Sequence, residues 1–539
     1  MLACSCVAGA QDKQATEPQE TPRFPIERFQ IEGSRILTAQ ELESLVAPYL
    51  GPQREYGDIQ RALEAIEYAY RERGYSAVHV LTPEQELTNG VVLLQVNETV
   101  LGKVNLPRHL EHFDATNLRA ALPALREGET PNAHDLSSQI ALNNENPAKQ
   151  VEVVLSLGGQ ENQVDADLKL AESDPLRVSL SLDNTGNRQT GSHRVGVTVQ
   201  HANLWNRDHV ASFAYQTSPE KPDFVNIYSL SYRLPVYAWS GAFDFIFARS
   251  AVSSGSSTIA STGGLVTFNG SGIGRVYGMR YTQALPRHAD TTQKLVLGWD
   301  IKANDNSCDL TLQDSGSRTD CGGASSSDIT LRPLSLTYSR MSFGPGQATE
   351  HNGTLVVNVP GGKSGRGNDF QAIRPEAGGK GVSEHYGLAR YGFTHFRILE
   401  GDWQVRLAAN AQWTPQPLLP QERIGLAGST AVRGFLEREV ASDIGIVVNA
   451  ECYSPNFAES IGLPGTLRVL TFVDAGTGRN HLLKGESQPR NSLSSWGLGL
   501  RYASGKDVSA KLDLAQVITP NGEQSRGDWR GHLSLILSF

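Results

Sequence analysis

The 539-residue sequence contains no run of about eighteen apolar residues, which excludes a membrane-spanning helix. It contains no cluster of Lys and Arg, and its formal net charge is −9, so it lacks the basic footprint of a nucleic-acid-binding protein. A membrane-spanning β-barrel is compatible with this composition, because its wall needs only strands of about ten residues with alternating polarity.

Signatures of enzymatic chemistry are also absent. The sequence has no G-x-S-x-G nucleophile motif, no H-E-x-x-H pair and no C-x-x-C site. Gly362-Lys363-Ser364 matches the end of a phosphate-binding loop, but Val357 stands where that loop requires its first glycine. The 13 His are dispersed, and His109 and His112 lie in a polar, solvated stretch. We therefore predict no catalytic residue, no metal site, no cofactor and no nucleotide as energy source.

Cysteine is rare, with five residues in the chain. Residues 1–10, MLACSCVAGA, resemble the end of a secretory signal with a small-residue cleavage site, and residues 11–23 form a polar linker. An unprocessed N-terminal tail is the alternative. Cys308 and Cys321 lie in one polar loop and are candidates for a disulfide in an oxidising compartment, with two free thiols as the alternative.

Residues 24–98 and 99–172 are predicted to form two small α+β modules. Each has the order strand, helix, helix, strand, strand, although the two share pattern and not sequence. In the first module, Thr38 and Glu41 form a capping box at the start of a helix, and Asp58 is expected to cap the next one.

From residue 173 to the C-terminus, helical periodicity gives way to short segments of alternating polarity separated by turn residues. In one of them, Trp496, Leu498 and Leu500 point one way while Gly497 and Gly499 point the other. Sixteen such segments lie near residues 177–184, 193–200, 209–217, 226–234, 241–249, 273–285, 293–304, 330–341, 351–359, 385–399, 403–412, 439–453, 466–475, 494–503, 508–517 and 530–539.

The connections between these segments distinguish a barrel from a two-sheet sandwich, the alternative way to bury apolar faces. Short and long connections alternate, as in outer-membrane barrels with short periplasmic turns and long outer loops. The last strand ends on an aromatic residue, which resembles the recognition signal read by the barrel-assembly machinery during biogenesis. Its residues on one face are Leu533, Leu535, Leu537 and Phe539. We predict a 16-stranded antiparallel barrel in contact with outer-membrane lipid.

Two α+β modules followed by such a barrel resemble the transporters of two-partner secretion, the haemolysin and adhesin secretion proteins, whose modules are called POTRA domains. LNNENPAKQVEVVLSLGG, which contains Asn146 and Pro147, is similar to a segment of the family's second POTRA domain, and NLWNRDHVASFAYQTSPE is similar to an early barrel turn and strand. VRGF at Val432–Phe435 and FVDAG at Phe472–Gly476 are shared with the wider superfamily that includes barrel-assembly factors.

The strand count places VRGF in the sixth outer loop, within residues 415–437, and Asp474 on the inward face of strand thirteen. The resemblance implies that this loop enters the pore and that Arg433 pairs there with Asp474. A carboxylate accepts the planar guanidinium fork in a bidentate manner. Gly434 permits a tight backbone, and Phe435 can pack on the lumen wall. Phe472 and Gly476 belong with Asp474 to the predicted lumen-wall partner of this motif.

The resemblance implies a Gram-negative outer-membrane protein with periplasmic POTRA domains. These would capture a secreted partner exoprotein, a large adhesin or cytolysin with an N-terminal secretion domain, and the barrel would export it unfolded. A barrel-assembly factor of the same superfamily is the first alternative. A passive porin would need neither the modules nor VRGF, and an outer-membrane esterase or protease would need nucleophile motifs that the chain lacks.

Overall fold

The computed structural model describes residues 22–539, apart from 87–88, 189, 253–255, 262–263, 270–271, 289, 306–308, 312–317, 321–327, 374–381 and 482–489. The chain divides into two compact units. One contains the described residues up to Val104 together with Arg126–Ala133 and Leu155–Ala166. The other contains Asn105–Leu125, His134–Val154 and Asp167–Phe539.

The first α+β module packs two helices on a three-stranded sheet. The sheet has the order β2-β5-β4, in which β5 is parallel to β2 and antiparallel to β4, and β1 pairs separately with β3. Its elements are β1 (Phe24–Ile26), β2 (Arg28–Glu32), α1 (Ala39–Val46), β3 (Gly51–Arg54), α2 (Tyr56–Glu72), β4 (Val78–Leu81) and β5 (Val91–Glu98). The short strand β3 has no alternating pattern of its own, and sequence reasoning did not find it.

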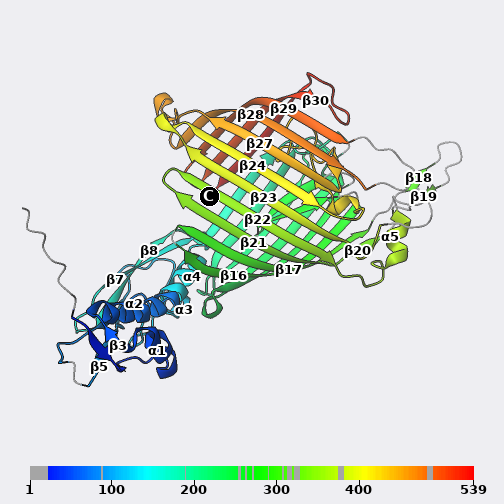
Figure 1. The fold of residues 1–539 in the computed structure, drawn as a ribbon. Coiled ribbons are helices and arrows are strands. Elements are labelled where there is room, and N and C mark those ends of the chain that lie inside the picture. Colours follow the sequence, from blue (N-terminus) through cyan, green and yellow to red (C-terminus); the bar gives the residue numbers. More distant parts are fainter. Residues whose placement is uncertain are drawn as a thin grey trace, which may run out of the picture. The chain divides into compact units, whose positions relative to one another are not determined.

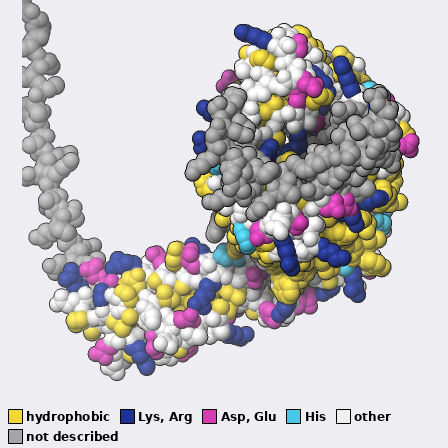
Figure 2. All heavy atoms as spheres, turned by 90° about the vertical axis from the view of Figure 1, so that its right-hand side faces the viewer, with side chains coloured by type: hydrophobic (Ala, Val, Ile, Leu, Met, Phe, Trp, Pro, Cys, Tyr) yellow, Lys and Arg dark blue, Asp and Glu magenta, His cyan; other side chains and the backbone are white. Residues whose placement is uncertain are grey.

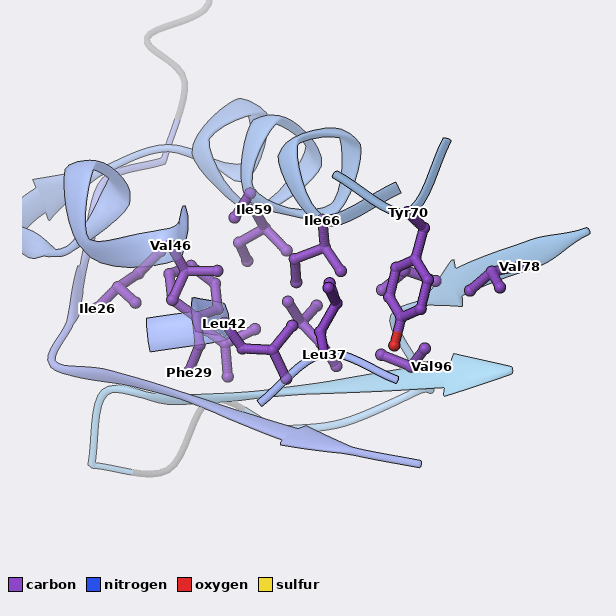
Figure 3. Close-up of a cluster of buried hydrophobic side chains, with 14 residues drawn as sticks. Ile26, Phe29, Leu37, Leu42, Val46, Ile59, Ile66, Tyr70, Val78 and Val96 are labelled. Atoms are coloured by element: carbon purple, nitrogen blue, oxygen red, sulfur yellow. The ribbon is translucent and has the colours of Figure 1, made fainter. Parts of the chain in front are cut away.

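The core of this module lies between the helices and the sheet. Ile59, Ile66 and Tyr70 of α2 point toward the sheet, where the ring of Tyr70 lies next to Val96 of β5, and Leu42 of α1 completes this layer (Figure 3). These apolar positions recur on one face of each helix, so that face is buried while the polar face meets water. The module therefore has a hydrophobic core of its own.

The helix starts follow the sequence with one correction. Thr38 and Glu41 form the expected capping box on α1, with each side chain accepting from the other's backbone N–H. The prediction that Asp58 caps α2 is wrong, because the N-cap is Glu55. Asp58 occupies the third helical position, and its carboxylate accepts the backbone N–H of Glu55 at 3.0 Å. Helix α2 starts earlier than predicted because Glu55, at the N-cap, and Asp58, at the third helical position, form a capping box.

Among the described residues, the second module has no counterparts of β1 and β3, and its sheet has the order β6-β8-β7. Its helix α3 begins after Asp114, whose side chain accepts the backbone N–H of Asn117. The elements are β6 (Val100–Asn105), α3 (Ala115–Ala121), α4 (Ala133–Asn143), β7 (Lys149–Leu157) and β8 (Gln163–Glu172). Among the residues described, no helix in either module or elsewhere is long and apolar enough to cross a membrane.

The rest of the chain is a closed antiparallel barrel, and the prediction of sixteen strands is confirmed. Its strands lie side by side with a common tilt (Figure 1). β31 closes the wall by pairing with β9. The eighth strand is interrupted at Arg332 and carries the labels β20 and β21. The barrel strands are β9 (Leu176–Asp183), β10 (Arg194–Leu204), β11 (His209–Thr217), β12 (Val225–Val236), β13 (Gly241–Val252), β16 (Gly272–His288), β17 (Thr291–Asp305), β20 (Ile329–Leu331), β21 (Pro333–Gly344), β22 (Gln347–Asn358), β23 (Gly387–Ile398), β24 (Gln404–Trp413), β27 (Ile444–Tyr453), β28 (Thr466–Arg479), β29 (Asn491–Ser504), β30 (Val508–Thr519) and β31 (Trp529–Ser538).

The outer wall of the barrel is apolar. On β28, Val473 is 54% exposed while its neighbour Asp474 is fully buried, which is the alternation that the strand period requires. Leu498 on β29 and Leu512 on β30 are likewise exposed, and Figure 2 shows hydrophobic side chains gathered over the outer wall. An apolar band of this kind on a closed barrel is a surface for lipid.

Long connections between barrel strands contain small elements that the sequence pattern did not reveal. The expectation that helices end before the barrel is wrong at α5, which is too short to show a helical period. The strand expected from residue 439 starts instead at Ile444, because β26 pairs with β25 of its own loop. These elements are β14 (Ser256–Ser261), β15 (Gly264–Asn269), β18 (Asp309–Thr311), β19 (Arg318–Asp320), α5 (Gly367–Ile373), β25 (Ile424–Gly425) and β26 (Ala441–Ser442).

Candidate functional site

The connection between β24 and β27 carries VRGF and packs against inward-facing side chains of the barrel wall. Val432 and Phe435 are fully buried and lie in one apolar cluster with Leu426 of the same loop. The wall contributes to this cluster from three strands, through Val447 of β27, Leu493 of β29 and Val517 of β30. We call residues 414–443 the lumen loop.

The backbone of the lumen loop is held by its own hydrogen bonds. The N–H of Val432 donates to the carbonyl of Leu426 at 3.1 Å, and the N–H of Gly428 donates to the carbonyl of Val432 at 3.0 Å. Gly434 has a φ of 98°, in the region that favours glycine. This turn directs the preceding side chain, that of Arg433, into the wall.

Arg433 and Asp474 form a bidentate ion pair. Nε lies 2.7 Å from Oδ2 and Nη2 lies 2.8 Å from Oδ1, while the backbone N–H of Arg433 also donates to Oδ2 at 3.2 Å. Asn449 of β27 donates from Nδ2 to the same carboxylate at 2.8 Å and to the carbonyl of Ala431 at 2.7 Å. Arg433 is 3% exposed and Asp474 is fully buried, so both charges depend on each other for compensation.

Two more carboxylates and an aromatic ring surround the same guanidinium. Nη1 of Arg433 lies 2.9 Å from Oε1 of Glu451 and 3.5 Å from Oδ1 of Asp513, and its Cζ lies 3.4 Å from the ring centre of Phe472. Arg406 pairs with Glu451, and Arg501 pairs with Asp513. The resulting charge cluster contains three carboxylates and three guanidinium groups, from Asp474, Glu451, Asp513, Arg406, Arg433 and Arg501.

The last strand of the barrel also holds the lumen loop. His532 of β31 is 6% exposed, and its Nε2 accepts the backbone N–H of Gly434 at 2.9 Å. Because Nε2 is an acceptor here, the proton of the neutral imidazole belongs on Nδ1. Sequence reasoning did not single out His532, Glu451 or Asp513. Their only signal is an inward position on a strand, which many polar residues share.

The two other wall residues of the FVDAG motif also lie at the loop. Phe472 is 1% exposed, and its ring packs against the guanidinium group of Arg433. A Cβ added to Gly476 would meet Cγ2 of Val432 at 3.0 Å. The absence of a side chain at Gly476 therefore lets the lumen loop approach β28 closely.

A cavity of about 610 Å³ lies beside the lumen loop. The loop lines it with Thr430, Arg433 and Glu437, and the wall lines it with polar and charged residues such as Asn410 and Lys511. Charges of both signs face this space, which therefore suits water and a polar chain better than an apolar ligand. Among the side chains that the structure describes, no group of three or more metal-binding residues converges.

Of the remaining predicted residues, Leu533 lines the cavity beside the lumen loop, and the others that the structure describes lie elsewhere in the fold. Asn146 lies beside the barrel residue Ala202, and Pro147 lies beside Lys506 of the β29–β30 turn. At the C-terminus, Phe539 is 76% exposed, and it exchanges backbone hydrogen bonds with Val178 near the start of the barrel. Leu535 and Leu537 line an apolar groove on β31, and Leu533 is 37% exposed. Cys308 and Cys321 lie outside the described residues.

Comparison with known families identifies the class of protein. The sequence profile described as haemolysin secretion/activation protein ShlB/FhaC/HecB matches residues 162–502, which is more than half of the chain. The chain belongs to this family. Residues 24–99 match the profile of the ShlB-type POTRA domain.

Relatives of the family span most of the chain. An outer membrane transporter CdiB of Escherichia coli O6:K15:H31 is 23% identical over 501 residues, which cover 90% of this chain and 78% of the relative. A heme/hemopexin transporter protein, HuxB of Haemophilus influenzae, is 20% identical over 522 residues, which cover 93% of this chain and 84% of the relative.

Solved structures show the same fold. CdiB from Escherichia coli has a TM-score of 0.73 at 20% identity, with 98% of this chain and 92% of that chain covered. CdiB from Acinetobacter baumannii has a TM-score of 0.70 at 17% identity, with 99% and 93% covered. The family membership makes this chain a two-partner secretion transporter of the outer membrane, with POTRA modules in the periplasm.

Proposed function

We propose that this chain captures a partner exoprotein through its POTRA modules and exports it unfolded through the barrel. The observation that carries this proposal is the charge cluster, in which a loop of the chain itself is held inside the barrel through Arg433. A loop that is fixed by ion pairs can leave the wall without breaking a strand pairing. The polar cavity beside it gives an extended chain a hydrated route.

Capture by the first module fits the free edges of its sheet. In the order β2-β5-β4, the two outer strands each have one neighbour among the described residues. A strand with an unpaired edge can accept an extended peptide as an additional strand, with affinity from main-chain hydrogen bonds. We assign the recognition of the exoprotein to such an edge.

In this assignment, residues 24–98 and 99–172 are two POTRA domains, and residues 173–539 are the barrel with a pore-entering loop at 415–437. No phosphate-binding loop occurs in the sequence, so nucleotide hydrolysis does not drive the process. The free energy comes instead from folding of the exoprotein after it leaves the barrel, which prevents its return.

The test of this function is Arg433→Ala, measured as export of the exoprotein that is co-expressed with the transporter. Removal of the guanidinium leaves Asp474 buried without its main ionic partner, at a cost of about 3–5 kcal/mol. We expect the barrel to insert in the outer membrane, because no strand pairing involves Arg433, and export to fall sharply.

Arg468→Ala is the matched control. Arg468 pairs with Asp402 through a single nitrogen, Nη2, at 2.8 and 3.0 Å from the two carboxylate oxygens, and this more exposed pair does not contact the lumen loop. Undiminished export by Arg433→Ala would contradict the role of the loop. A loss of many outer-membrane barrels in place of one exoprotein would indicate an assembly factor.

A further inference from the structure

A second buried ion pair joins the second module to the barrel. Nζ of Lys149, at the start of β7, lies 2.6 Å from Oδ2 of Asp208 in the turn between β10 and β11. The two side chains are 0% and 1% exposed, so this pair is as buried as that of Arg433. Both residues belong to the same compact unit.

The surroundings of the ammonium group are built from both sides of the contact. Asn117 of α3 offers its Oδ1 at 3.3 Å, and the rings of Phe113 and Tyr237 lie 5.2 and 5.8 Å from Nζ. Tyr237 donates from its hydroxyl to Oδ2 of Asp208 at 2.7 Å. Burial lowers the pKa of Lys149, and Asp208 opposes this shift. Both side chains are withdrawn from solvent, and the site holds one ammonium group.

The turn that presents Asp208 is held in an uncommon conformation. Trp205, Asn206 and Asp208 have φ values of 54°, 54° and 61°, a region that residues other than glycine rarely adopt. Asn203 stabilises the turn, since its Oδ1 accepts the N–H of Asp208 at 3.1 Å and its Nδ2 donates to the carbonyl of His112 at 2.8 Å. Backbone strain of this kind persists where surrounding contacts impose it, and it suggests a functional constraint.

The Asn-Pro motif of the second module belongs to the same contact. Asn146 donates from Nδ2 to the carbonyl of Ala202 at 2.8 Å, and its Oδ1 accepts the N–H of Ala148 at 2.9 Å. Next to it, Phe113 and Ala148 of the module share an apolar cluster with Ala202 and Val210 of the barrel. The contact therefore combines an apolar core with one charge pair.

We propose that the Lys149–Asp208 pair is the positioning contact that fixes the second module on the β10–β11 turn. Export depends on this contact through geometry, because a captured chain can enter the barrel only from a module held in one place. This dependence rests on the function proposed above. Oδ1 of Asp208 has no hydrogen-bond partner among the described residues, so a module that shifts would leave a buried carboxylate with Tyr237 alone. The pair therefore favours one docked position over a range of positions.

The experiment compares Lys149→Met and Asp208→Asn with the double variant in the full-length transporter. A single substitution leaves one buried charge uncompensated, which shifts the docking equilibrium by at least about a hundredfold. The double variant removes both charges and keeps an oxygen for Tyr237. We expect residues 202–210 to lose protection in hydrogen–deuterium exchange in each single variant and to regain it in the double variant. Export of the co-expressed exoprotein should follow the same order, while all variants insert in the outer membrane.

Lys169→Met is the matched control, because Lys169 pairs with Glu152 in the same module but both side chains are more than 60% exposed. The proposal would be overturned if Lys149→Met showed the same hydrogen–deuterium exchange and the same export as the wild type. A double variant that docks but does not export would also overturn it. A third outcome separates the two proposals: hydrogen–deuterium exchange follows the expected order, but the wild-type transporter exports nothing. This outcome would support the docking contact. It would overturn the link of that contact to export and contradict the proposed function.

Discussion

At the residue scale, Arg433 acts as a shared partner for three carboxylates. Asp474 receives its bidentate fork, while Glu451 and Asp513 face the remaining nitrogen. Arginine suits this position better than lysine, because a planar fork can satisfy two oxygens at once and also stack on the ring of Phe472. Arginine can therefore make all of these contacts at once, whereas lysine cannot.

A pH effect is expected at Glu41 in the first module. Arg73 donates to its carboxylate, and the backbone N–H and hydroxyl of Thr38 donate as well, which together lower the pKa of Glu41 to about 2. Because the folded-state pKa is depressed, this contribution to stability is present above the ordinary pKa and is lost as the pH falls toward 2. A carbon-13 NMR titration of the Glu41 carboxyl would measure the shift.

Arg73→Gln is the comparison for this titration. It should raise the pKa of Glu41 toward its ordinary value of about 4.3, because the first cause of the shift is then removed. An unchanged pKa in Arg73→Gln would show that Thr38 alone accounts for the effect.

Single residues of the site differ in how far the sequence predicts them. The resemblance to the family implies the pairing of Arg433 with Asp474, and the inward position of Asp474 follows from the two-residue period of a strand. The sequence does not predict Glu451, Asp513 and His532 as site residues, because their contacts with the lumen loop depend on how deeply the loop enters the barrel. That depth is set by packing among distant strands, and it leaves no local mark in the sequence.

At the scale of elements, the lumen loop connects parts of the wall that are far apart in the chain. It contacts β28 through Asp474 and β31 through His532. β31 is also the strand that closes the barrel, and its register with β9 extends over five residue pairs, from Ser534↔Asp183 to Ser538↔Ser179. The lumen loop therefore holds β31 two residues before the pairing that closes the barrel.

We predict that His532→Ala makes the loop leave the wall more often. Loss of the hydrogen bond from Gly434 costs about 1 kcal/mol, which corresponds to about a fivefold change in the equilibrium. Conductance of the purified transporter in planar lipid bilayers should show more frequent openings. His532→Gln should retain part of the closed state, because its amide oxygen can accept the same N–H.

The matched control for this prediction is His395→Ala. His395 of β23 makes a comparable hydrogen bond, 2.8 Å from Nδ1 to the hydroxyl of Thr349, but it does not contact the lumen loop. Equal opening frequencies in the two alanine variants would mean that any loss of a barrel histidine perturbs the pore.

Elements with a long regular pattern were predictable, and short ones were not. Barrel strands alternate over many residues and helix α1 has a capping box, so both leave a periodic or local signal. The strand β3 and the helix α5 are too short to do so. In α2 an acidic residue took the N-cap position that sequence rules give to Asp58, which moved the start of the helix.

At the scale of the whole molecule, the proposed function implies that removal of the first module would separate recognition of the exoprotein from membrane insertion. We predict that deletion of residues 24–98 abolishes binding of the exoprotein while the barrel still inserts. The deleted segment has its own hydrophobic core, and the barrel closes through pairings that do not involve it. Co-purification of the exoprotein and fractionation of outer membranes would measure the two effects. Binding that survives the deletion would assign recognition to the second module or to the barrel.

The charge cluster has a consequence for what the pore attracts. When Arg433 leaves the wall, Arg406 and Arg501 remain opposite three carboxylates, which leaves an excess of one negative charge. The loop is therefore a built-in counter-ion, and its departure turns the wall into a small cation exchanger. Under the proposed export function, a lysine or arginine of the exported chain would take the place that Arg433 leaves. We predict that neutral and acidic stretches would not, so that the composition of the exported chain would set how readily the loop returns.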